Sequence, residues 1–166
     1  MYTPTDEIIK RIFGEILRSH LATPGFDEKL KLYSDKIMDA TVMFFTRTIR
    51  NPQFSPSAKK FHYQFNFREL AKIIEGVMRS VPQIYKNTNS ILRIWYHEIR
   101  RVFEDRFINN DDLVLFRSIL KDAISKTIGD FQEKDSPFND PIIYTSFMGE
   151  FYAPIDDIVD LRRVMK

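Results

Sequence analysis

The pair His97 and Glu98 is where this sequence most resembles an enzyme active site. The run H-E-I-R-R over residues 97–101 begins like H-E-x-x-H, in which two histidines one helical turn apart bind zinc and the glutamate acts as a base. Arg101 stands in place of the second histidine, so the motif is incomplete, and the pattern predicts that His97 and Glu98 point to adjacent faces of one helix. An enzyme using this pair stays open only if both side chains share a pocket.

Arg68 is the second residue whose chemistry stands out. It falls in the first turn of an expected helix, where the helix dipole favours anions and a cation is mildly unfavourable. A guanidinium beside the free N–H groups of a helix start can bind a phosphate. Pairing with Glu69, or with a neighbouring helix, is the structural alternative. The sequence leaves both readings open, an anion from outside the chain and an internal partner.

Composition excludes several other classes of site. The 166 residues contain no cysteine, and the five glycines form no G-x-x-x-x-G-K-[ST] loop, so we expect no thiolate metal site and no nucleotide held by this chain alone. The net charge of +2 is too small to indicate nucleic acid. No apolar run approaches the roughly 18 residues of a membrane span, and no secretory signal is visible at the start.

Helical periodicity of apolar residues predicts the elements that carry these side chains. We expect five helices, over about residues 4–22, 27–50, 66–81, 91–107 and 113–129. Thr3 and Pro4 suit the start of the first, and Asn66 with Glu69 has capping-box spacing at the start of the third. The predicted fold class is therefore all-α, a five-helix bundle.

The faces of these helices predict the core. We expect the first helix to be buried through Ile9, Ile12, Phe13, Ile16 and Leu17. The third should be buried through Phe67, Leu70, Ala71, Ile74, Val77 and Met78, with Gly76 where another helix approaches closely. The stripe of the fourth is Ile91, Trp95, Ile99, Val102, Phe103 and Phe107. Buried aromatic residues dominate core energetics, so we place Trp95, Ile99, Phe103, Leu70 and Ile74 at the centre.

The opposite side of the fourth helix is expected to face solvent. Its charged residues are Arg93, Glu98, Arg100, Arg101, Glu104, Asp105 and Arg106. Arg100 with Glu104, and Arg101 with Asp105, stand four residues apart and can pair along a helix surface.

Residues after the fifth helix differ in character. Residues 1–128 carry 21 basic and 15 acidic side chains, whereas residues 129–166 carry 4 and 8. Residues 130–140 are polar and aperiodic, which predicts a linker, and residues 141–145 form a short extended run. Helical spacing resumes at Ile155, Ile158, Leu161 and Met165, and no cap follows. We therefore expect a fragment of a longer protein, with the residues after 130 poorly anchored.

Three stretches resemble dynein heavy chains. Residues 61–70, F-H-Y-Q-F-N-F-R-E-L, resemble the HY-x-FN-x-R-[DE]-L segment of that family. Residues 91–98 and 101–106 resemble L-x-R-[IL]-W-x-HE and R-[VL]-F-x-DR, and residues 141–147 with 152–155 resemble P-[IL]-L-[YF]…F…Y-x-P-[IV]. The resemblance covers nearly the whole chain and is weakest over residues 54–60 and 121–140. Phe67 stands where the family often has leucine and keeps the apolar character.

The resemblance implies a place in a ring of AAA+ modules. Residues 1–129 would be a helical AAA+ lid subdomain, residues 130–140 a linker, and residues 141–166 the beginning of the next AAA+ large subdomain. The order suggests the lid of the third module running into the fourth. By resemblance, Arg68 matches the sensor-2 arginine, which reaches the γ-phosphate of ATP. The nucleotide, ATP or ADP with Mg, would be held mainly by the large subdomain of the same module.

The function implied by the resemblance is that of a moving part. The lid would sense nucleotide and relay conformational change between AAA+ modules, with its own large subdomain and the neighbouring module as partners. The parent would be an ATP-hydrolysing, minus-end-directed microtubule motor of the cytoplasm and cytoskeleton, including the ciliary axoneme, bound to other dynein subunits. The chain itself, without Walker motifs, is not expected to be an enzyme. A free-standing helical scaffold that binds a partner peptide is the alternative.

Overall fold

The computed structural model describes residues 5–129, 136–139, 142–146, 149–155, 159 and 162–163. Its helices are α1 (Asp6–Leu21), α2 (Glu28–Arg50), α3 (Phe67–Val77), α4 (Thr88–Phe103) and α5 (Asn110–Thr127). Single 3-10 turns follow α2 and α4, η1 (Pro52–Phe54) and η2 (Glu104–Arg106). The all-α prediction with five helices is confirmed. No helix among the described residues is long and apolar enough to cross a membrane.

Short polar side chains start most of these helices. Thr5 is the N-cap residue of α1, whereas the predicted start at Thr3 and Pro4 lies outside the described residues. The Asp27 carboxylate accepts the amide of Lys29 at 3.0 Å and caps α2, which satisfies one of the donors that a helix start leaves free. α4 begins after Asn87, three residues earlier than the periodicity indicated.

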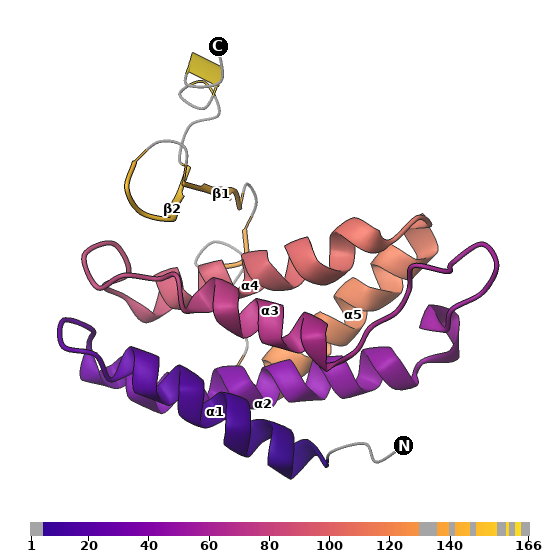
Figure 1. Ribbon diagram of the computed structural model, residues 1–166, viewed down its shortest axis with the longest axis horizontal. Coiled ribbons are helices and arrows are strands. Elements are labelled where there is room, and N and C mark those ends of the chain that lie inside the picture. Colours follow the sequence, from indigo (N-terminus) through magenta and orange to yellow (C-terminus); the bar gives the residue numbers. More distant parts are fainter. Residues whose placement is uncertain are drawn as a thin grey trace.

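The helices form two layers joined through α2 (Figure 1). α1 packs along α2 on one side of the molecule, and α3 packs along α4 on the other. α2 also contacts α5 and α4, so the long second helix joins the two layers. The short strands β1 (Tyr144–Thr145) and β2 (Ala153–Pro154) lie beyond the α3–α4 layer, away from α1.

The apolar side of α4 forms the centre of the core. Trp95 is fully buried, and its indole N–H donates to the hydroxyl of Thr41 on α2 at 2.9 Å. Phe103 meets Phe44 of α2 edge-on and stacks on Phe116 of α5, with ring centres 5.5 and 5.8 Å apart. The predicted core is confirmed, because the following five residues are all at most 2% exposed: Leu70, Ile74, Trp95, Ile99 and Phe103.

The prediction of which apolar side chains of α1 and α3 are buried is wrong at the edges of both helix faces. Ile12 and Ile16 were expected to be buried and are 53% and 40% exposed, and Met78 is 40% exposed. α1 makes most of its helix contacts with α2, so one neighbour covers Ile9 and Leu17 but leaves the flank of the stripe uncovered. Periodicity identifies an apolar face but does not give the width that a neighbour covers.

The predicted solvent side of α4 is wrong at two acids. Glu98 is 1% exposed and Glu104 is 9% exposed, although both were assigned to the solvated face. Arg100 does pair with Glu104 at 3.2 Å, but Arg101 pairs with Glu98 and not with the expected Asp105 in the described contacts. α4 also ends earlier than predicted, because the chain tightens into η2 after Phe103 and Phe107 is extended.

Residues 137–139, which follow α5, lie against α4. Arg93 of α4 donates to the carbonyl oxygens of Pro137 and Asn139, and Phe138 packs on Tyr96 with ring centres 4.9 Å apart. The expectation of a poorly anchored segment is therefore wrong for these residues. The polar sequence hid this packing because the anchoring groups are mostly backbone carbonyls.

β1 and β2 form an antiparallel pair in which Tyr144 faces Pro154 and Thr145 faces Ala153. This confirms the extended run at its described residues. Ile155 is buried, and Val159, Arg162 and Arg163 are helical, in agreement with a further helix. Ile158, Leu161 and Met165 lie outside the described residues.

Candidate functional site

The start of α3 is fixed by a reciprocal capping box. The side-chain oxygen of Asn66 accepts a hydrogen bond from the backbone N–H of Arg68 at 2.8 Å, and the backbone N–H of Asn66 donates to the Glu69 carboxylate at 3.1 Å. This is the spacing that the sequence predicted, and the prediction is confirmed. The backbone around Arg68 is thus held rigidly on both sides of the helix start.

The Arg68 side chain is exposed on this rigid turn. Within the part of the chain that the structure describes, no acid forms an ion pair with its guanidinium. Glu69, the expected internal partner, contacts Arg106 at 3.0 Å and Lys72 at 3.9 Å instead. The neighbouring carboxylate is therefore engaged elsewhere, and Arg68 offers its charge outward.

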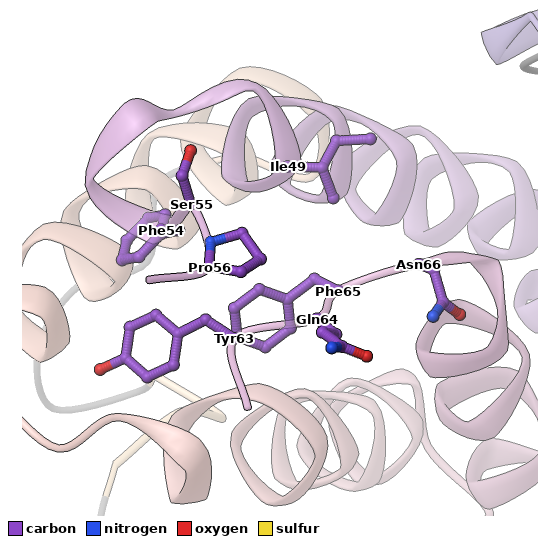
Figure 2. Close-up of a pocket in the computed structure, with 8 residues that line it drawn as sticks. All are labelled: Ile49, Phe54, Ser55, Pro56, Tyr63, Gln64, Phe65 and Asn66. Atoms are coloured by element: carbon purple, nitrogen blue, oxygen red, sulfur yellow. The ribbon is translucent and has the colours of Figure 1, made fainter. Parts of the chain in front are cut away.

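A hollow of about 260 Å³ lies beside this helix start (Figure 2). Its walls come from the end of α2, from the chain after η1 and from the segment that enters α3. The residues that line it are Ile49, Phe54, Ser55, Pro56, Tyr63, Gln64, Phe65 and Asn66. Aromatic rings and an aliphatic side chain make most of the surface, and the amides of Gln64 and Asn66 supply hydrogen-bonding groups at one end.

The two chain segments around the hollow are tied together by Asp112, which sequence reasoning missed. Its buried carboxylate accepts the Tyr63 hydroxyl at 2.9 Å and the Gln53 amide at 2.8 Å, and pairs with Lys60 at 2.6 Å. Burial raises the pKa of Asp112, but these three partners outweigh burial and hold the pKa below its usual value.

A second polar cluster joins α4 to the segment after the bundle. The Tyr152 hydroxyl donates to Glu98 at 2.9 Å and lies 3.0 Å from Nε2 of His97. Arg101 donates to the other Glu98 oxygen at 2.5 and 3.0 Å. The pattern placed His97 and Glu98 on adjacent faces of one helix, and a tyrosine 54 residues from Glu98 reaches both side chains. We call these four side chains the α4 joint.

The α4 joint extends into α3 and into the strand pair. Glu98 lies directly over Gly76, so a Cβ atom there would overlap the carboxylate; this confirms the predicted close approach. Nδ1 of His97 is 3.3 Å from the Ile142 carbonyl oxygen, and the Tyr85 hydroxyl donates to the Tyr152 carbonyl at 2.7 Å. Hydrogen bonds thus connect α4 with Ile142 and Tyr152, and α3 meets the joint through the close contact of Gly76 with Glu98.

The chemistry of the α4 joint is structural in character. Burial lowers the pKa of His97 and outweighs the opposing effect of Glu98, and burial raises the pKa of Tyr152. Among the described residues, no three histidine, cysteine or acidic side chains could together hold a metal ion. A neutral imidazole and a bridged carboxylate in a packed interior favour a fixed connection over a reaction centre.

The family model described as the AAA+ lid domain matches residues 37–136. The chain therefore belongs to the AAA+ lid domain family, and the similar proteins named below are dynein heavy chains. The resemblance predicted from the three motif stretches is confirmed.

Similar proteins are axonemal dynein chains. The chain is 34% identical over 92% of its length to the dynein beta chain of the flagellar outer arm of Chlamydomonas reinhardtii. It is 31% identical over 95% of its length to dynein axonemal heavy chain 3 of Mus musculus, and 30% identical over its full length to dynein axonemal heavy chain 2 of Homo sapiens. It spans only 3% to 4% of the length of these relatives.

Proposed function

We propose that this chain is the nucleotide-sensing lid of one AAA+ module in a dynein heavy chain, the third of the ring, and that it relays movement to the fourth. The parent would be an ATP-driven, minus-end-directed microtubule motor. The relatives named above are axonemal, which supports a place in the cytoskeleton of a cilium or flagellum. Residues 1–129 would form the lid, residues 130–140 the linker and residues 141–166 the beginning of the next large subdomain.

The observation that carries this proposal is the exposed guanidinium of Arg68 on a fixed helix start. The helix dipole makes the first turn of α3 attractive to an anion, and an arginine there adds a charge-assisted donor. The nearest acid is engaged by Arg106 and Lys72. The large subdomain of the same module would hold ATP with Mg, and Arg68 would contact its γ-phosphate as the lid closes.

The α4 joint supports the relay. Its hydrogen bonds connect α4 with Ile142 and Tyr152, and Glu98 lies against Gly76 of α3, so a rotation of α3 toward nucleotide would carry those residues with it. A buried polar network has defined geometry and resists shear more than an apolar contact of the same area. The neighbouring AAA+ module is the partner that such a movement would reach.

Replacing Arg68 by alanine in the intact heavy chain tests the proposal. We expect the variant to lose one charge-assisted contact to nucleotide, worth roughly 1.5–3 kcal/mol. ATP-dependent release from microtubules should weaken correspondingly. The free energy of unfolding of the chain should change by no more than about 0.5 kcal/mol, as for an ordinary surface site. Stopped-flow release kinetics and urea unfolding measure the two quantities.

Arg50→Ala is the matched control, because Arg50 is an exposed arginine at the end of α2 and does not lie on the α3 turn. It should leave microtubule release unchanged. If Arg68→Ala unfolds the chain while release kinetics survive in a stabilised background, Arg68 is structural and the sensing proposal fails.

A further inference from the structure

Four contacts of Arg106 reach residues 62–69, which form the segment that leads into α3 and the first turn of that helix. Its guanidinium pairs with Glu69 at 3.0 Å and lies 5.8 Å from the centre of the Phe65 ring. The same group is 3.5 Å from the Gln64 carbonyl oxygen, the outer limit of a hydrogen bond. Nε2–H of His62 donates to the Arg106 carbonyl at 3.0 Å. The turn η2 is thus fastened to residues 62–69, although 37 residues separate Glu69 from Arg106.

A continuous set of hydrogen bonds runs from Arg106 to Arg68. One oxygen of Glu69 accepts the Arg106 guanidinium, and the other accepts the amide of Asn66 at 3.1 Å. The side-chain oxygen of Asn66 then accepts the Arg68 amide at 2.8 Å. A shift of the Glu69 carboxylate would therefore be transmitted through the capping box to the backbone that carries Arg68.

Arg106 also sets the charge around that helix start. Glu69 is buried, and a free carboxylate next to Arg68 would draw the guanidinium inward and repel a phosphate. Burial raises the pKa of Glu69, but the Asn66 amide and Arg106 outweigh it and hold the pKa below its usual value. The carboxylate is thus ionised and needs a counter-charge. Arg106 supplies it at 3.0 Å, with Lys72 at 3.9 Å as the weaker partner.

We propose that Arg106 is the positioning residue of Arg68: it holds Glu69 in the capping box and neutralises it, so that the Arg68 side chain stays directed outward. This inference rests on the proposed role of Arg68 toward nucleotide. It assigns a separate task to the end of α4, since η2 follows that helix directly. The turn at the end of α4 would then position Arg68, and the middle of α4 would carry the α4 joint.

The test uses the intact heavy chain with Arg106→Gln, Glu69→Gln and Arg68→Ala, and measures microtubule release against ATP concentration. Glutamine at position 69 can still cap through its amide oxygen but carries no charge. We expect Arg106→Gln to raise the ATP concentration for half-maximal release by roughly 3- to 10-fold, with little change in the maximal rate. The double variant Arg106→Gln with Arg68→Ala should be no worse than Arg68→Ala alone, because both act through one contact.

Two further variants separate positioning from folding. Arg117→Gln is the matched control, because it removes the ion pair between Arg117 of α5 and Glu104 of η2, which has no partner in α3 among the described contacts. It should leave the ATP dependence unchanged. Arg106→Lys keeps the charge toward Glu69 and should recover part of the loss. Hydrogen exchange at the Arg68 and Glu69 amides should rise in Arg106→Gln and stay normal in Arg117→Gln.

The outcomes distinguish this inference from the proposal beneath it. If Arg68→Ala weakens the ATP response and Arg106→Gln does not, the positioning role of Arg106 is overturned and the sensing role stands. Additive losses in the double variant would also overturn it, because Arg106 would then act independently. If Arg68→Ala has no effect, the sensing proposal itself fails, whatever Arg106→Gln does.

Discussion

The apolar side of α4 and Glu98 on its polar side are both buried, but by different means. On the apolar side, Trp95 and Phe103 pack against rings and aliphatic groups of α2 and α5. On the polar side, Glu98 is buried because Arg101, Tyr152 and His97 surround it. Apolar burial follows from residue type, whereas burial of a charge requires partners that satisfy it.

The apolar side therefore contributes mainly to the stability of the bundle, and the α4 joint mainly links separate segments of the chain. The apolar side can be repacked by residues of similar volume with modest loss, since dispersion and burial have no direction. The α4 joint has donors and acceptors in fixed positions contributed by three parts of the chain. A change on the apolar side should therefore alter the free energy of unfolding of the bundle. A change in the joint should alter which segments move together.

Trp95→Ala should give the largest effect, because it removes a fully buried indole from the centre of the apolar side. We expect the free energy of unfolding to fall by roughly 3–5 kcal/mol. Part of that loss comes from the Thr41 hydroxyl, which loses its indole donor. Urea unfolding followed by circular dichroism measures it. Leu32→Ala, at a side chain 75% exposed, is the control; equal stability of the two variants would contradict the core described above.

Gly76→Ala should have an intermediate effect on stability: it should destabilise the protein, whereas Gly14→Ala should stabilise it. Alanine normally stabilises a helix relative to glycine by about 1 kcal/mol. At Gly14 the new methyl group would make an ordinary contact with Met38 at 3.6 Å, so that gain should be realised. At Gly76 the methyl group would displace the Glu98 carboxylate, and overpacking typically costs about 1–3 kcal/mol. Thermal unfolding of both variants checks the contrast; stabilisation by both would mean that Glu98 moves freely.

Lowering the pH should give the smallest change in the free energy of unfolding, and it should act through two histidines. One is His97 in the α4 joint, and the other is His20, whose Nε2 lies 3.1 Å from both the carbonyl oxygen and the hydroxyl of Ser80. Burial lowers the pKa of both side chains in the folded state. The unfolded chain, with histidine pKa values near about 6.5, therefore binds protons first as the pH falls, and stability decreases below about pH 7. The urea midpoint should decline between about pH 7.5 and pH 5.5. His20→Gln with His97→Gln should flatten this slope; an unchanged slope would mean that these two groups do not cause it.

Local patterns predicted much of the candidate site. The capping box of Asn66 and Glu69 follows from residues three apart, and the structure forms it as expected. The close approach at Gly76 followed from a glycine inside an apolar face. Neither pattern identified Arg106, because its partners lie some 40 residues earlier in the chain and its own surroundings read as a solvated surface.

The sequence by itself determined the helices, the apolar centre at Trp95 and the family, because periodicity, caps and motif spacing are properties of neighbouring residues. Only the tertiary structure decided which charged groups are buried. Glu98 and Glu104 carry the same pattern as a solvated helix face, and they are enclosed because Tyr152, Arg101 and Arg117 approach from other turns and segments. The same holds for Ile12 and Ile16, which have a core pattern and remain exposed because no described helix covers that flank of α1. Burial depends on what arrives from elsewhere in the chain, and no local spacing records that.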